Sequence, residues 1–247
     1  MKEGRLTYKE GNLGYLFYKK MYEVNPNRNG LNQSFLINKK VTESLLSSRI
    51  SPFTQQGDFD LETTYPGLLL GTGYQHGIDK VFLTDNKNQT DIKVGFYFDY
   101  TTGMPVIPGS SIKGTIRSAF EHPRYVNELL SQVGATPFDK MEAIQKLEKS
   151  FFECGDVYFD AYPIGNISMD FDYWTPHDDN PTIGPNPIKL LRVKPGVVYR
   201  FQFIIKDESI LNAEQKRKFI KKVILDLGLG AKTNHGYGYF REQGQLK

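Results

Sequence analysis

An α+β fold is predicted by the order of strand-like and helix-like segments along this 247-residue chain. Four short apolar or alternating segments are expected to form strands, at residues 68–71, 157–161, 197–205 and 237–241. Two amphipathic segments are expected to form helices, at residues 111–122 and 213–227. The resulting order, β-α-β-β-α-β, is typical of a ferredoxin-like (RRM-like) domain. We therefore predict a single domain over residues 1–247 that carries long insertions.

The first predicted strand follows a long N-terminal stretch. Residues 1–64 show no clear periodicity and are interpreted as an N-terminal extension. Leu68, Leu69 and Leu70 form an apolar run that ends at a glycine turn, as a buried strand does. Residues 92–100 alternate less strictly because aromatic residues interrupt the pattern, which indicates a strand or one arm of a hairpin.

The first predicted helix begins within Pro-Gly-Ser-Ser-Ile-Lys-Gly-Thr-Ile-Arg at residues 108–117. Ser110 and Ser111 are good N-cap residues, and Lys113 and Arg117 lie four residues apart, on one flank of the helix. Free N–H groups at a helix start, together with two cations, would suit a phosphate. An ordinary capped helix with two solvated cations explains the same residues. Taken alone, this stretch favours that second interpretation.

Two insertions are predicted, one on either side of the second strand. Residues 123–153 contain two amphipathic segments, and the second helix is expected to open with a capping box at residues 136–139. Residues 163–192 are rich in Pro, Asp and Asn, which indicates a long loop insertion, and they include the only tryptophan, Trp174. The spacing of the acidic residues and His177 in this loop matches no standard set of metal ligands, so no metal site is expected.

The second predicted helix leads into Gly-Leu-Gly-Ala-Lys-Thr-Asn-His-Gly-Tyr-Gly at residues 228–238. Two Gly-x-Gly pairs permit positive φ angles and close approach of another chain, and the residues between them supply a cation and several hydrogen-bond donors. A nucleotide-binding P-loop is excluded because a P-loop runs from a strand into a helix, whereas this loop leaves a helix. A helix C-cap followed by a tight turn explains Gly228 but not the other glycines.

The predicted topology relates these two stretches to each other. One is the entry into the first helix and the other is the exit from the second helix. Because the central strands of such a sheet are adjacent, the two stretches are expected to form one composite anion-binding surface.

The composition limits the class of protein. A formal net charge of +3 does not by itself indicate a nucleic-acid binder, so any such function must come from a local surface. The single cysteine, Cys154, excludes an intramolecular disulfide and a cysteine-based metal cluster. No apolar run approaches membrane-spanning length and no signal-peptide core follows the first residues. We therefore expect a cytoplasmic protein without membrane contact.

The stretches at 108–117 and 228–238 together resemble the paired signatures of the RAMP superfamily of CRISPR-associated proteins. Gly-Asp-Val-Tyr-Phe-Asp-Ala-Tyr-Pro at 155–163 and Trp-Thr-Pro-His at 174–177 are similar to one branch of that superfamily, the sixth subunit of the type III-B (Cmr-type) effector complex. The resemblance extends from about residue 65 to residue 241 in spaced blocks.

The resemblance implies a RAMP fold and a non-catalytic RNA-binding backbone subunit of an effector complex in antiviral defence. Its partners would be the 3′ region of the crRNA, target RNA, and other RAMP and small helical subunits; no cofactor is implied. Trp174 would either stack on a base or pack in the interior, and the sequence does not separate these roles. Carried over by position, the remaining RNA-binding residues would be Ser110, Ser111, Lys113, Arg117, Gly230, Lys232, Thr233, Asn234, His235 and Gly236.

The competing interpretation is an enzyme. RAMP relatives include endoribonucleases that use a histidine and target-cleaving subunits that use an aspartate, and His76, His235 and Asp79 are the candidates here. No histidine is paired in the sequence with a helper base, and the residues around Asp79 lack the slicer pattern. We therefore expect no catalytic residue, and an endoribonuclease that cleaves crRNA precursor or target RNA stands as the alternative.

Overall fold

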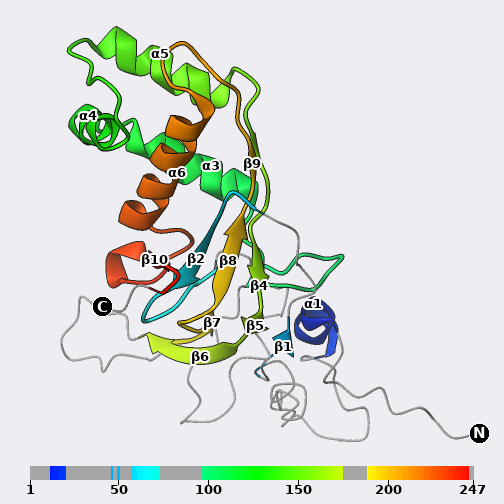
Figure 1. Cartoon of the computed structure of the whole chain (residues 1–247). Coiled ribbons are helices and arrows are strands. Elements are labelled where there is room, and N and C mark those ends of the chain that lie inside the picture. Colours follow the sequence, from blue (N-terminus) through cyan, green and yellow to red (C-terminus); the bar gives the residue numbers. More distant parts are fainter. Residues whose placement is uncertain are drawn as a thin grey trace, which may run out of the picture.

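A four-stranded antiparallel sheet in the order β10-β2-β8-β4 lies at the centre of the computed structural model (Figure 1), which describes residues 12–20, 46, 49–50, 57–72, 96–174 and 188–244. Its strands are β2 (Phe59–Thr63), β4 (Tyr162–Ile164), β8 (Val198–Phe201) and β10 (Phe240–Glu242). Helix α3 (Gly109–Ala119) follows β2, and helix α6 (Ala213–Leu227) precedes β10. The core elements therefore confirm the predicted α+β fold and its β-α-β-β-α-β order.

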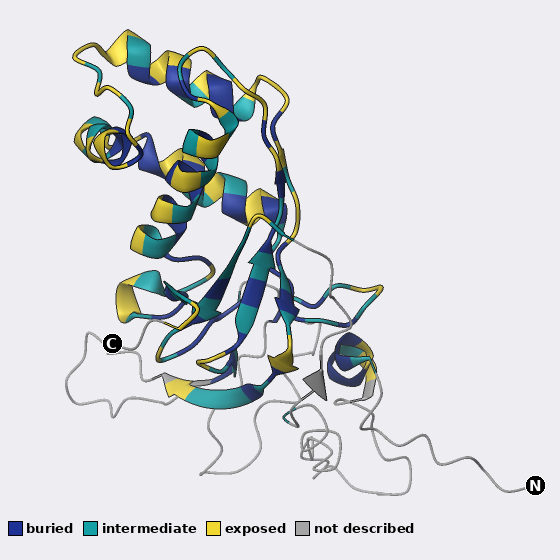
Figure 2. Cartoon of the chain, in the orientation of Figure 1, coloured by how far each residue is buried: buried dark blue, intermediate teal, exposed yellow. Residues whose placement is uncertain are grey.

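Alternation along the central strands separates an apolar face of the sheet from a charged face. Leu61 and Tyr199 are cross-strand partners, and both are fully buried in one core with the apolar faces of α3 and α6 (Figure 2). The intervening side chains point to the other face, as a period of two requires. There Asp60 lies opposite Arg200, whose Nε donates to Asp60 Oδ1 at 2.8 Å. Such cross-strand ion pairs help to fix the register of β2 against β8.

Two further helices extend the helical layer beside the sheet: α4 (Pro123–Gln132) and α5 (Met141–Phe152). Aromatic packing joins α5 to its neighbours, because the Phe151 ring lies 5.7 Å from the Phe120 ring and 5.1 Å from the Phe219 ring of α6. Near the N-terminus, α1 (Leu13–Tyr15) continues into the π-helical turn η2 (Leu16–Lys20). There the Tyr18 hydroxyl donates to the Phe96 carbonyl at 2.8 Å. None of the described helices is both long and apolar enough to cross a membrane.

A buried ion pair near the N-terminal end of α6 attaches this helix to the rest of the helical layer. The side chains of Lys216 and Asp156 are 0% exposed, and Lys216 Nζ lies 3.0 Å from Asp156 Oδ2. Lys216 also donates to the Ser150 carbonyl at 2.8 Å, while Asp156 Oδ1 accepts the Lys206 N–H at 2.9 Å. These hydrogen bonds give the buried charges the partners that they need.

In the described part of the chain, three short two-stranded ribbons flank the sheet. In the first, β3 (Val157–Tyr158) pairs with β9 (Phe203–Ile204), and in the second, β1 (Arg49–Ile50) pairs with β5 (Asn166–Ile167). The third pairs β6 (Met169–Trp174) with β7 (Ile188–Val193) over six residues of each strand.

The prediction of the first core strand at 68–71 was wrong. The strand is β2, which lies within the residues assigned to the N-terminal extension, and Leu68 forms only an isolated bridge with Val193. The run at residues 68–70 is buried because it passes beside β7 and beside the glycine loop (residues 228–238). Its continuous apolar pattern therefore resembled that of a buried strand. In β2, the charged residues that alternate with the buried ones weakened the apolar signal.

The prediction that residues 163–192 form a loop was also wrong, because they contain β6 and β7. Met169, Asp170, Phe171, Asp172 and Tyr173 alternate between apolar and acidic side chains, which is a strand pattern. The high Asp content indicated a turn instead.

The second core strand is β4, which comes directly after the predicted strand at residues 157–161. The first two residues of that predicted strand form β3. Helix α5 begins at Met141 rather than at the predicted capping box, and its N-cap makes no side-chain hydrogen bond.

Candidate functional site

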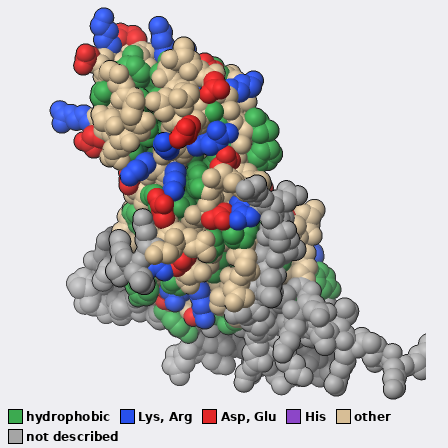
Figure 3. All heavy atoms as spheres, in the orientation of Figure 1, with side chains coloured by type: hydrophobic (Ala, Val, Ile, Leu, Met, Phe, Trp, Pro, Cys, Tyr) green, Lys and Arg blue, Asp and Glu red, His purple; other side chains and the backbone are tan. Residues whose placement is uncertain are grey.

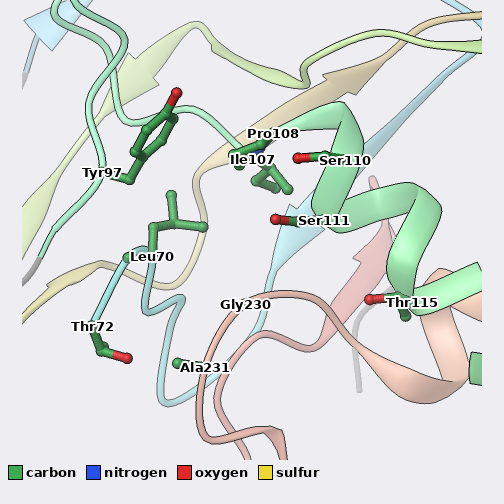
Figure 4. A pocket seen from close by; sticks show the side chains of 11 residues that line it. Leu70, Thr72, Tyr97, Ile107, Pro108, Ser110, Ser111, Thr115, Gly230 and Ala231 are labelled. Atoms are coloured by element: carbon green, nitrogen blue, oxygen red, sulfur yellow. The ribbon is translucent and has the colours of Figure 1, made fainter. Parts of the chain in front are cut away.

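A cleft of about 540 Å³ lies where the entry to α3 meets the exit from α6 (Figure 4). The side chains of α3 lie on one side, residues 70–72 and Tyr97 lie opposite, and the loop after α6 passes between them. The predicted juxtaposition of the two glycine-containing stretches is therefore confirmed. The residues that line the cleft are Leu70, Gly71, Thr72, Tyr97, Ile107, Pro108, Ser110, Ser111, Thr115, Gly230 and Ala231.

Helix α3 presents a row of hydroxyl groups to the cleft. Ser110 and Ser111 lie in its first turn and are exposed, and Thr115 lies one turn further along the same side. The three hydroxyls point toward the wall that carries Leu70 and Thr72 (Figure 4). The serines are not the predicted N-caps, because Pro108 occupies the cap position and no side-chain cap is made.

A backbone N–H group at the start of α3 is instead hydrogen-bonded to an acidic side chain. The Gly109 N–H donates to Asp160 Oδ1 at 2.7 Å. A carboxylate at this position complements the positive end of the helix dipole. The predicted anion site at this helix start therefore already has an anionic partner from the protein itself.

The glycine loop lines the cleft with Gly230 and Ala231, and its backbone packs on residues 68–70. The Ala231 N–H donates to the Leu69 carbonyl, and the Leu229 N–H to the Gly238 carbonyl, both at 2.9 Å. Gly230 has φ = +89°, and a Cβ at this position would lie 2.4 Å from the Leu69 carbonyl oxygen. Only glycine fits this conformation and this close approach without strain.

The polar centre of the loop lies beyond the lining of the cleft. Lys232 has φ = +59°, a left-handed conformation that is uncommon for a residue other than glycine. Thr233–His235 form a single 3₁₀ turn, η4, and Gly236 ends that turn with φ = +89°. Asn234 and His235 are exposed.

Lys113 and Arg117 lie on the opposite flank of α3 from the cleft, facing α5. Lys113 Nζ is 5.7 Å from the centre of the Phe152 ring and donates to the Phe152 carbonyl at 3.5 Å. The Arg117 guanidinium lies 4.5 Å from the same ring centre, and its Nε is 3.8 Å from Glu148 Oε1. The expectation that these two cations share a surface with the glycine loop is corrected, because the apolar face of α3 sets its rotation and turns them toward α5.

A second polar group ties the glycine loop to the β6–β7 ribbon. The Tyr237 hydroxyl donates to Asp172 Oδ2 at 2.6 Å, and Arg192 donates to the same oxygen at 2.6 Å. Burial and the hydrogen bond to Asp172 raise the pKa of Tyr237 above its usual value, so this hydroxyl stays protonated. Asp172 therefore holds two parts of the fold together.

Several predicted residues lie outside the described parts of the chain. These are His76, Asp79 and His177, together with the side chain of Trp174, whose backbone ends β6. Within the described ranges, no three His, Cys, Asp or Glu residues are grouped as metal ligands would be.

Among the hydroxyl-bearing side chains that line the cleft, Thr72, Tyr97 and Thr115 were missed by the sequence interpretation. For Thr115 a signal exists, since Ser111 and Thr115 are four residues apart and must share a flank of the helix. Thr72 and Tyr97 reach the cleft only through the tertiary fold.

Comparison with known proteins places the fold in a family, since the RAMP superfamily model matches residues 60–241. The chain belongs to the RAMP superfamily. Both stretches that form the cleft fall inside the matched region.

Individual relatives of this RAMP protein agree with that placement. The CRISPR system CMR subunit Cmr6 of Saccharolobus solfataricus is 30% identical over 153 residues, which are 59% of this chain and 48% of the relative. The chain thus spans about half the length of that relative. The predicted resemblance to the RAMP superfamily, and within it to Cmr6, is confirmed.

Two solved structures are also similar. A chain in the cryo-EM structure of the Type III-B Cmr-beta bound to cognate target RNA has a TM-score of 0.50 and 25% identity, and the match covers 74% of this chain and 56% of that one. The crystal structure of Cmr6 from Pyrococcus furiosus has a TM-score of 0.44 and 22% identity, with 74% of this chain and 95% of that chain covered.

Proposed function

We propose that this RAMP protein is a non-catalytic RNA-binding subunit of a type III-B CRISPR effector complex, where it contacts the 3′ region of the crRNA and target RNA. The observation that carries the proposal is the cleft itself, which joins the start of α3 to the glycine loop inside the region that the family model matches. Similarity to a Cmr6 subunit and to a chain of a Cmr structure bound to target RNA supports this setting.

The chemistry of the site suits binding that is independent of nucleotide sequence. Hydroxyl groups and glycine-exposed backbone can contact the sugar and phosphate of any nucleotide, as a guide of variable sequence requires. The loop also presents Lys232, held in a left-handed conformation directly after the cleft residue Ala231. A side chain that the fold holds in an unusual backbone conformation at a ligand site is a candidate for a positioned contact. We assign Lys232 to a phosphate of the bound RNA.

The lining of the cleft favours binding over cleavage. Acid–base cleavage of RNA needs a group that takes the 2′-hydroxyl proton and a second group that assists the leaving oxygen. The described residues that line the cleft include no histidine, lysine or carboxylate. His235 lies in the 3₁₀ turn beyond them.

Binding is tested with the full-length chain and a guide RNA in a filter-binding titration at several salt concentrations. The wild-type chain is expected to bind, and Lys232→Ala is expected to weaken binding and to lower the slope of log affinity against log salt by about one unit. Lys218→Ala is the matched control, since Lys218 pairs with Glu214 on the exposed side of α6. A wild-type chain that neither binds RNA nor co-purifies with it and with sister subunits would overturn the proposal.

Catalysis is tested separately with magnesium or manganese present. The purified chain is expected to leave guide and target RNA intact. In a reconstituted complex, His76→Ala, His235→Ala and Asp79→Ala are each expected to retain every cut. Loss of one cut site in an intact complex that carries Asp79→Ala would instead make this chain a ribonuclease subunit.

A further inference from the structure

The cleft differs from a typical phosphate site in its lack of charge. Its described lining consists of five hydroxyl-bearing side chains, Tyr97 included, besides apolar groups and glycine backbone, and none of these residues is charged. Four of the hydroxyls belong to aliphatic side chains, namely Thr72, Ser110, Ser111 and Thr115. Within the described chain, none of these four makes a side-chain hydrogen bond, so each is available as a donor and as an acceptor.

The charged residues at the start of α3 and along this helix argue against a phosphate beside the helix in the cleft. Asp160 places a carboxylate at the start of α3, where it accepts the Gly109 N–H at 2.7 Å beside Pro108 of the lining. The two cations of α3 face Phe152, on the other flank. A phosphate in the cleft would therefore meet a negative charge at the helix start and no cation from the helix.

The shape and the apolar groups of the cleft suit a nucleoside. A volume of about 540 Å³ is within the range of small-molecule pockets. The Tyr97 ring is partly exposed and offers aromatic surface for a base, and base stacking on aromatic side chains does not depend on sequence. The hydroxyl row of α3 matches a ribose, whose 2′-hydroxyl both donates and accepts hydrogen bonds.

We infer that the cleft holds an uncharged part of a single-stranded RNA, one ribose with its base, while the phosphates lie outside it near Lys232. This inference rests on the proposed RNA binding and adds to it the part of the nucleotide that each region contacts. The hydroxyls of Ser111 and Thr115 then form hydrogen bonds with the ribose 2′-hydroxyl, which DNA lacks, and so distinguish RNA from DNA.

The test is fluorescence anisotropy of the full-length chain with a labelled oligouridine RNA and with the deoxy oligonucleotide of matching length. The wild-type chain is expected to prefer the RNA. Ser111→Ala and Thr115→Val are each expected to weaken RNA binding by about fivefold and to reduce the preference over DNA, since each removes one uncharged hydrogen bond. The slope of log affinity against log salt is expected to stay unchanged, because no phosphate contact is lost.

Ser118→Ala is the matched control on the same helix. Its hydroxyl bonds to the Thr115 carbonyl at 2.8 Å and does not line the cleft, so its RNA affinity should equal that of the wild type. Circular dichroism establishes that each variant is folded.

Three results would overturn the inference. A fall of about one unit in the salt slope of either variant would place a phosphate in the cleft. Unchanged affinity in both variants, while the wild type binds RNA, would show that the cleft is not used although the proposed function holds. A wild-type chain that binds no RNA would overturn the proposed function and this inference with it.

Discussion

The two flanks of helix α3 carry different chemistry although only a few residues separate them in sequence. On the flank that faces α5, Lys113 and Arg117 pack over the Phe152 ring, and Arg117 also lies near Glu148. On the flank that faces the cleft, Ser110, Ser111 and Thr115 carry neutral hydroxyls without protein partners among the described residues. The charged flank contacts the protein, and the neutral flank is the one that we propose to contact RNA.

The same division holds across the helical layer. Lys216 is buried against Asp156, and Arg217 donates to Asp58 at 2.6 Å. Figure 3 shows Lys and Arg side chains interspersed with Asp and Glu over the helices in the upper part of the molecule. A cation of this layer that is buried or packed against an aromatic ring is therefore expected to affect folding, whereas a hydroxyl in the cleft is expected to affect binding. Three substitutions test that comparison.

The largest effect is expected from Lys216→Ala. Removing one partner of a buried ion pair leaves Asp156 buried without its counter-charge, which costs about 3–5 kcal/mol of unfolding free energy. The measurement is urea denaturation followed by circular dichroism. Lys218→Ala on the exposed side of the same helix is the control and should leave the unfolding midpoint nearly unchanged. A loss no larger than that of the control would show that the buried pair does not stabilise the helical layer.

A smaller but still large effect is expected from Gly230→Val, on the cleft side. The positive φ and the close Leu69 carbonyl make a β-branched side chain strained, at a cost of about 3 kcal/mol. Gly114→Ala provides the contrast, since Gly114 lies in α3 with open space around its Cα, and alanine there should stabilise the protein by about 0.5–1 kcal/mol. Both values come from thermal unfolding. Equal stability of Gly230→Val and wild type would mean that the loop has no need of its backbone conformation.

The smallest effect is expected from Arg117→Ala. Loss of its contact with Phe152 should cost about 0.5 kcal/mol, because the side chain is 56% exposed. RNA affinity and its salt slope should not change, since the guanidinium faces α5. A slope that falls by about one unit would place Arg117 on the RNA path, as the sequence interpretation proposed, and would remove the distinction between the two flanks.

The sequence by itself determined the order of the core elements and the two stretches that form the site. Helix α6 occupies the predicted residues 213–227, because Asn212 and Gln215 form a capping box and a regular apolar stripe follows. The glycine loop was identified because glycine is the residue that tolerates positive φ, and such positions are local properties of the chain. The family resemblance rested on these same local patterns.

Only the tertiary structure decided which residues face the site. The rotation of α3 is set by Ile112 and Ile116, which are buried in the core, and this rotation turns the cations to α5 and the hydroxyls to the cleft. The apolar run at 68–70 is buried by β7 and the glycine loop, both distant in sequence, so its pattern alone could not separate a strand from a buried connection. The partner of a buried charge is equally non-local, since Lys216 and Asp156 are 60 residues apart. Spacing along a helix shows which side chains share a flank, but the packing of the rest of the chain decides what that flank meets.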